Sequence, residues 1–89
     1  MDIVHDTDAH QFRVALEGYR GELDYTLRDG VMIITHTEVP PAIGGRGIAA
    51  ELTRTALATA RGEGWKVLPA CSYAAAFIRR HPEFSDLLA

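Results

Sequence analysis

Among the side chains suited to nucleophilic or acid–base chemistry, the candidates for catalysis are Cys71, His36 and Glu38. Cys71 lies between an expected strand and an expected helix, where the helix dipole favours the reactive thiolate. His36 and Glu38 are two positions apart in an expected strand, so either is placed to act as a base or to orient the other. The alternatives are a buried, inert cysteine that acts as a small hydrophobic residue, and a solvent-facing His–Glu pair or a histidine bonded to a neighbouring backbone carbonyl. A metal site on these three residues is rejected, because they contain no close pair of metal ligands.

A glycine-rich stretch provides a second kind of chemistry. Three glycines in four positions leave little side chain to obstruct a ligand, and a helical pattern begins directly after them. A loop of this kind that opens a helix presents free backbone N–H groups and the positive end of the helix dipole, which suits a phosphate or pyrophosphate. The alternative is a turn that merely connects strand to helix. The stretch consists of Ile43, Gly44, Gly45, Arg46, Gly47, Ile48 and Ala49.

Two well-known phosphate loops fit this stretch poorly. Residues 45–50 match the pattern G-x-G-x-x-A of dinucleotide-binding folds. However, that loop follows the first strand of a parallel sheet and needs several further βα units, whereas here a double proline and hairpin-linked strands precede it. A Walker A loop requires Lys-Ser or Lys-Thr after the glycines, and neither is present.

The elements that must position these residues begin with strands. Alternating apolar residues predict strands at 12–16 and 23–27, separated by a turn at 18–21, with a short edge strand at 3–5. Asp29-Gly30 predicts a type I′ hairpin turn into a strand at 31–39, whose apolar start indicates a central strand buried on both faces. Period-two geometry places His36 and Glu38 on the same face as Met32 and Ile34.

Helical patterns follow the double proline. A helix is expected at about 47–61, with Ala49, Leu52, Ala56, Leu57 and Ala60 on its apolar face. A strand at 65–70 then forms a right-handed βαβ unit with the strand at 31–39. Ser72 is the expected N-cap of a second helix at 73–80, and a final turn packs the apolar residues of 83–89. The order βββαβα predicts an α/β fold with a mixed, mostly antiparallel sheet of four to five strands and two main helices.

Composition limits the class of protein. The 89 residues suffice for a single domain, 1–89, and 47% hydrophobic residues indicate a globular one. A net charge of −3 with scattered basic residues gives no reason to expect nucleic-acid or membrane binding. The acidic start lacks a signal-peptide pattern, and one cysteine cannot form an internal disulfide, so a cytoplasmic setting is expected.

The motifs together resemble a known family. Residues 39–49 look like the acetyl-coenzyme A loop of the GNAT acetyltransferases, whose motif is Q/R-x-x-G-x-G/A. Gly45 and Gly47 match the motif glycines, while Ala42 replaces the usual Gln or Arg and Gly44 stands where Arg is frequent. The segments 36–40, 71–73 and 79–84 are similar to the small single-domain members, which have a minimal GNAT core.

The resemblance implies acetyl-CoA and CoA as cofactors and an unidentified amine, on a small molecule or a macromolecule, as acceptor. It implies that the loop amides hold the pyrophosphate, that the Val39 backbone binds pantetheine, and that Cys71 faces the acetyl group and forms an acetyl-cysteine intermediate or lines the pocket. Tyr73 and Phe77 share a helix face that would pack along pantetheine, and Arg46 would pair with a phosphate. The competing interpretation is a CoA-binding module without turnover.

Overall fold

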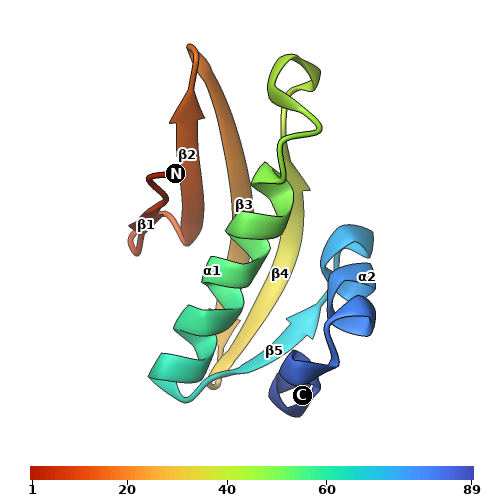
Figure 1. The fold of residues 1–89 in the computed structure, drawn as a ribbon. Helices are drawn as coiled ribbons and strands as arrows, with labels where there is room; N and C mark the ends of the chain where they lie inside the picture. The colour runs from red at the N-terminus through yellow and green to blue at the C-terminus, as the bar shows by residue number, and fades with distance from the viewer.

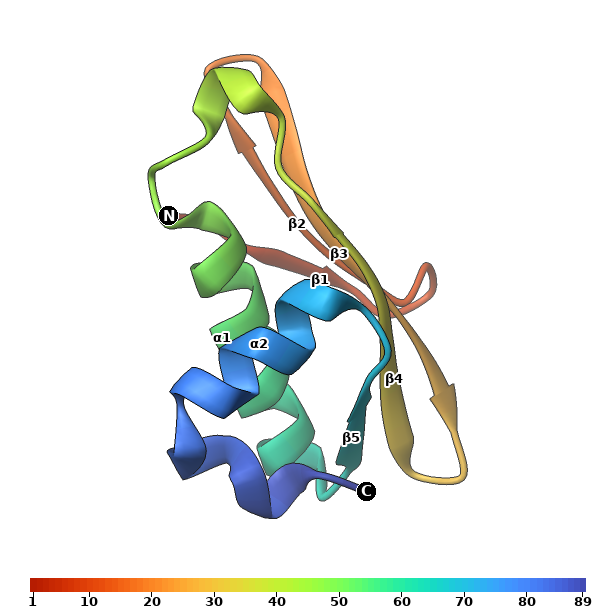
Figure 2. The same ribbon diagram turned by 90° about the vertical axis from the view of Figure 1, so that its right-hand side faces the viewer.

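The computed structural model describes residues 1–89 as one five-stranded sheet with helices on one side. The sheet order is β1-β2-β3-β4-β5, antiparallel up to β4, with β5 parallel to β4. Both α1 and α2 cover the same face of the sheet, and we call the other side the open face (Figures 1 and 2). The predicted α/β architecture is therefore confirmed. The elements are β1 (Val4–Asp6), β2 (Gln11–Leu16), β3 (Tyr19–Arg28), β4 (Val31–Glu38), the 3-10 helix η1 (Pro41–Ile43), α1 (Ile48–Glu63), β5 (Lys66–Pro69), α2 (Ser72–Arg80) and the 3-10 helix η2 (Pro82–Leu87).

The core lies between the sheet and the helices. Its sheet side is made by alternate residues of β2, β3 and β4, among them Phe12, Leu23 and Ile34. Four residues of the expected apolar face of α1 are fully buried, and Ala49 is half-buried. The expected burial of β4 on both faces is wrong, since Val31 and Ile33 remain only half-buried on the open face, which no helix covers.

An irregularity in β4 overturns the expected grouping of its side chains. Tyr25 of β3 pairs with Ile34, but the preceding Asp24 pairs with His36, so Thr35 is an extra residue in β4. A bulge of this kind shifts the alternation of side chains by one position. Thr37, paired with the buried Leu23, therefore shares the helix-covered face with Ile34. His36 and Glu38 turn to the open face instead.

The β2–β3 connection is tighter than the sequence indicates. The turn consists of Glu17 and Gly18, with φ of 53° and 80°, and Gly21 lies within β3 rather than in the turn. A Cβ on Gly21 would lie 3.1 Å from Ile48 Cγ2, so this glycine allows the first turn of α1 to approach the sheet closely. The second hairpin is confirmed, because Asp29 and Gly30 both have positive φ, as a type I′ turn requires.

Candidate active site

The two parallel strands separate at the end of β5. Their pairing runs from Val31–Lys66 to Ile34–Pro69 and then stops. The carbonyl oxygen of Ile34 accepts hydrogen bonds from the amides of Ala70 at 2.9 Å and Cys71 at 3.0 Å. Beyond this point β4 continues to Glu38, whereas the other chain segment turns into α2 (Figure 1). Cys71 therefore lies where the two strands part.

The thiol of Cys71 is half-buried and held from two sides. The residue is the N-cap of α2, with extended backbone angles, and its Sγ accepts a hydrogen bond from the Ala74 amide at 3.4 Å. The hydroxyl of Thr37 lies 3.6 Å from Sγ. The expected cap at Ser72 is thus wrong by one position, because Ser72 already has helical backbone and the cap must precede it. The second expected helix otherwise ends as predicted, at Arg80.

His36 and Glu38 contact each other on the open face of the sheet, away from the Cys71 thiol. His36 Nε2 lies 3.3 Å from Glu38 Oε1, and both side chains are exposed. Since the bulge turns them to the open face, the sheet separates this pair from the face on which Thr37 meets Cys71. Their catalytic role stays a prediction, now tied to a substrate that approaches from the open face.

The glycine loop is anchored at both ends and free in the middle. The side chains of Ile43 and Ile48 are buried in the core, so they anchor the two ends of the loop. Gly45 and Gly47 have φ of 75° and 76°, a left-handed conformation that favours glycine. Gly44, Gly45, Arg46 and Gly47 are exposed, and α1 begins at Ile48 with no side-chain cap.

The backbone of this loop has unused hydrogen-bonding capacity. The amides of residues 45–50 donate no hydrogen bond within the protein, whereas the Glu51 amide donates to the Gly47 carbonyl and so closes the first helical turn. The N–H and C=O groups of the half-buried Val39 also form no hydrogen bond. Val39 lies between the loop and the end of β4. Unbonded donors therefore lie at the start of α1 and at Val39, directly after the end of β4.

Arg46 has an acidic partner that the sequence pattern did not reveal. Both of its terminal nitrogens donate to the carboxylate of Glu17, one of them at 3.2 Å. The hydrogen bond from Arg46 lowers the pKa of Glu17 below its ordinary value. Glu17 lies in the β2–β3 turn, 29 positions away, and only the folded sheet brings that turn beside the loop. No local motif marks it.

Tyr73 and Phe77 differ in exposure. Their ring centroids are 6.4 Å apart, which confirms the shared helix face. Phe77 is only 4% exposed and packs against His81, Phe84 and the guanidinium of Arg54. Tyr73 is 36% exposed. Of the two, Tyr73 has the free surface that a ligand would contact.

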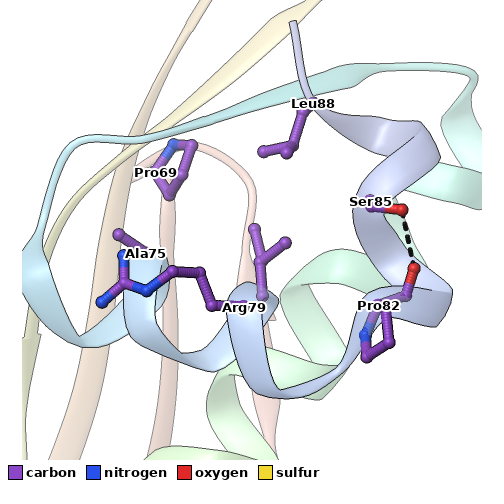
Figure 3. Close-up of a pocket in the computed structure, with 7 residues that line it drawn as sticks. Pro69, Ala75, Arg79, Pro82, Ser85 and Leu88 are labelled. Atoms are coloured by element: carbon purple, nitrogen blue, oxygen red, sulfur yellow. Dashed lines mark hydrogen bonds between the residues drawn. The ribbon is translucent and has the colours of Figure 1, made fainter.

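A cavity of ≈ 370 Å³ lies elsewhere, between α2, η2 and the end of β5 (Figure 3). The Arg79 side chain runs along it, and Ser85 Oγ donates to the Pro82 carbonyl at 2.7 Å on its wall. None of the expected site residues lines it. The lining residues are Pro69, Ala75, Ile78, Arg79, Pro82, Ser85 and Leu88.

Two further features of the structure concern metals and membranes. No three His, Cys, Asp or Glu residues gather into a group able to hold a metal ion. Neither helix combines the length and the apolar character needed to cross a bilayer.

Comparison with known proteins decides the family. The model of the GCN5-related N-acetyltransferases matches residues 11–87, which include the glycine loop, Val39 and Cys71. The chain belongs to this family. Protein NATD1 of Gallus gallus is 34% identical over 85 residues, which are 92% of this chain and 77% of that protein. Protein NATD1 of Homo sapiens is 35% identical over 83 residues, which are 90% of this chain and 74% of that protein.

A solved structure supports the fold. The NMR structure of a GCN5-like protein from Staphylococcus aureus superimposes with a TM-score of 0.77, covering 99% of this chain and 87% of that one. Its sequence identity is 22%, so the match concerns the fold alone. The resemblance drawn from the loop and the cysteine segment is thus confirmed, and the chain is a small GNAT-like domain.

Proposed function

We propose that this domain is an acetyl-CoA-dependent N-acetyltransferase that binds its coenzyme at the start of α1 and transfers the acetyl group at Cys71. The observation that carries the proposal is the row of unbonded amides at residues 45–50, at the positive end of a 16-residue helix. Free donors and a helix dipole together suit a pyrophosphate. The loop meets this requirement with its backbone, so the absence of a usual Gln or Arg at Ala42 does not remove the binding surface.

The remaining coenzyme contacts follow the same side of the sheet. The unbonded N–H and C=O groups of Val39 are suited to the amides of a pantetheine arm, and the exposed part of Tyr73 would pack against that arm. Where β4 and β5 part, the arm would bring its thioester to Cys71. The residues thus fit the coenzyme with backbone donors at one end and a thiol at the other.

Cys71 would take the acetyl group by thioester exchange. Its sulfur forms a bond to the acetyl carbon while the bond from that carbon to the coenzyme sulfur breaks, and the thiol proton of Cys71 passes to the departing sulfur. An amine then attacks the acetyl-cysteine, forms the amide and returns a proton to the Cys71 sulfur. Thr37, whose hydroxyl lies 3.6 Å from Sγ, and the Ala74 amide hold the sulfur in place during both steps.

The acceptor is proposed to be an unidentified amine that reaches the parting of the strands from the open face. His36 and Glu38 lie on that face and are exposed, so they are placed to remove a proton from an arriving ammonium group. No helix of this chain covers the open face (Figure 2). A macromolecular acceptor would bring the missing wall with it. The same bare face supports the second candidate function, a CoA-binding module without turnover.

Intact-mass and peptide analysis after incubation with acetyl-CoA would test the proposal, with calorimetry of coenzyme binding beside it. We expect coenzyme binding and a 1:1 acetyl adduct on Cys71, absent from Cys71→Ala. Binding without an adduct, and without loss of turnover in Cys71→Ala, would remove the covalent step and leave direct transfer. Binding without any turnover on a panel of amines would favour the CoA-binding module. No binding of CoA or acetyl-CoA would overturn the proposed function.

A further inference from the structure

We propose that Glu17 competes with the coenzyme phosphates for Arg46 and thereby sets the affinity of the glycine loop. This inference rests on the proposed coenzyme site. Glu17 would then determine coenzyme affinity through its contact with Arg46, although it lies outside the glycine loop, in the β2–β3 turn.

The geometry of the contact makes Glu17 a direct rival of a phosphate. Both terminal nitrogens of Arg46 are directed to the two carboxylate oxygens of Glu17, the same paired arrangement that a guanidinium offers to two phosphate oxygens. Arg46 cannot use that edge for both partners. A phosphate held by the amides beside Arg46 would either displace Glu17 from the guanidinium or bind without a contact to Arg46.

The charge distribution strengthens this competition. Arg46 is the only charged residue from Val39 to Ala50, so the loop has no second cation to offer. With Glu17 attached, the cation is neutralised and a carboxylate stands beside the place proposed for a pyrophosphate. Like charges in such proximity repel, although salt screens the effect at exposed positions.

Glu17 is held in place by its own turn. It is a non-glycine residue with φ of 53°, followed by Gly18 at 80°, and the turn joins Leu16 and Tyr19, which pair directly. The pairing of β2 with β3 therefore positions the backbone from which the Glu17 carboxylate reaches Arg46. A carboxylate on a paired hairpin stays closer to the loop than one on a free terminus would.

A second ion pair on the same helix serves as a matched control. Arg61, near the other end of α1, donates from both terminal nitrogens to the carboxylate of Asp86. The side chains in the Arg61 pair are 47% and 62% exposed, against 43% and 57% in the Arg46 pair. The two pairs are thus similar in chemistry and exposure, with one further bond from Arg61 to the Glu83 carbonyl, but only one pair lies in the glycine loop.

Calorimetric titration of the full chain with coenzyme A tests the inference. We expect Glu17→Gln to bind coenzyme A about threefold more tightly at low ionic strength, as loss of an exposed paired charge implies, and Asp86→Asn to bind like wild type. The gain should shrink at 0.5 M salt. It should also vanish when the substitution is made in an Arg46→Gln background, and it should be absent for pantetheine, which has no phosphate.

The other outcomes contradict the inference in distinguishable ways. Weaker binding by Glu17→Gln would show that Glu17 supports the loop, and a gain that persists in the Arg46→Gln background would show that Arg46 is not the intermediary. Dephospho-coenzyme A, which lacks the 3′-phosphate, distinguishes the phosphates: the gain is retained if the pyrophosphate competes. Absence of coenzyme binding in every variant, including wild type, would instead overturn the proposed function and this inference with it.

Discussion

The two helices of this domain begin in opposite ways. At the start of α1 Gly47 offers no side chain, and the amides of residues 45–50 stay unbonded. At the start of α2 the Cys71 sulfur caps the helix by accepting from the Ala74 amide. An uncapped helix end is costly unless water or a ligand satisfies it, whereas a capped one is complete in itself. The first is therefore suited to hold a ligand, and the second to hold one reactive atom in a fixed position.

The largest expected effect is a loss of acetyl transfer without a loss of coenzyme binding, caused by a substitution at the start of α2. Cys71→Ala should abolish the acetyl adduct and lower turnover about a hundredfold or more, because the nucleophile is lost, while coenzyme affinity stays within about twofold. Cys71→Ser keeps a cap of similar size and should recover most of the thermal stability, about 1 kcal/mol, but none of the adduct. Mass spectrometry, steady-state kinetics and thermal unfolding measure the three quantities. An adduct on Cys71→Ala would place the acetyl group elsewhere and end the contrast between the two helix starts.

The second effect is a loss of coenzyme affinity, caused by a substitution at the start of α1. Gly47→Ala forces a side chain into left-handed backbone at φ of 76° and should raise the Kd for coenzyme A about tenfold by disturbing the amides. Gly64→Ala is the matched control, because Gly64 has φ of 75° at the other end of the same helix. Both variants should lose about 1 kcal/mol of unfolding free energy. Equal losses of coenzyme affinity in the two variants would contradict a role for the loop.

A smaller effect should come from beneath the loop. A Cβ at Gly21 would lie 3.1 Å from Ile48 Cγ2, so Gly21→Ala should displace the first turn of α1, costing about 1 kcal/mol and raising the Kd for coenzyme A two- to threefold. Gly62→Ala is the control, since nothing lies within 4 Å of its added Cβ and helix propensity should stabilise it. Calorimetry and chemical denaturation measure both effects. Unchanged affinity in Gly21→Ala would show that the loop tolerates movement of the helix.

The smallest expected effect is a pH-dependent loss of stability from His5, which lies in β1, away from the starts of both helices. His5 Nε2 lies 2.6 Å from the Tyr25 hydroxyl, and burial lowers the pKa of His5 below 6.5. The unfolded chain then binds the proton more readily, so stability is complete above pH 6.5 and declines as the pH falls toward the folded-state pKa. We expect a fall in the melting temperature of at most about 3 °C from this group.

His5→Gln keeps a hydrogen-bonding group without a titration and should flatten this part of the profile. The same decline should appear unchanged in Gly47→Ala and Cys71→Ala, because distant sites act additively. Thermal melts between pH 7.5 and 5 make the comparison. A decline that disappears in either helix-start variant would show that β1 is coupled to the site.

Some features of the candidate site can be predicted from neighbouring residues in the sequence, and others depend on contacts between distant segments. The loop glycines, the double proline and Cys71 before a helix are visible in the sequence, because backbone conformation and helix boundaries follow from short stretches of residue types. The extra residue Thr35 was not visible, because a bulge is decided by how β3 and β4 pair. It reversed the expected face of His36 and Glu38. The local pattern likewise predicts Gly21 to be a turn residue, because the residue that requires a glycine there is Ile48, 27 positions later.

The order of the elements, the glycine loop before α1 and the position of the candidate nucleophile Cys71 can all be predicted from the sequence. Periodicity, turn residues and the family resemblance each depend on neighbours along the chain. Three features depend on the folded chain instead: the face that each side chain of β4 takes, the contact of Thr37 with the Cys71 thiol, and the contact of Glu17 with Arg46. These are contacts between segments brought together by strand pairing, and the register of that pairing is set by packing of the whole sheet rather than by any one stretch.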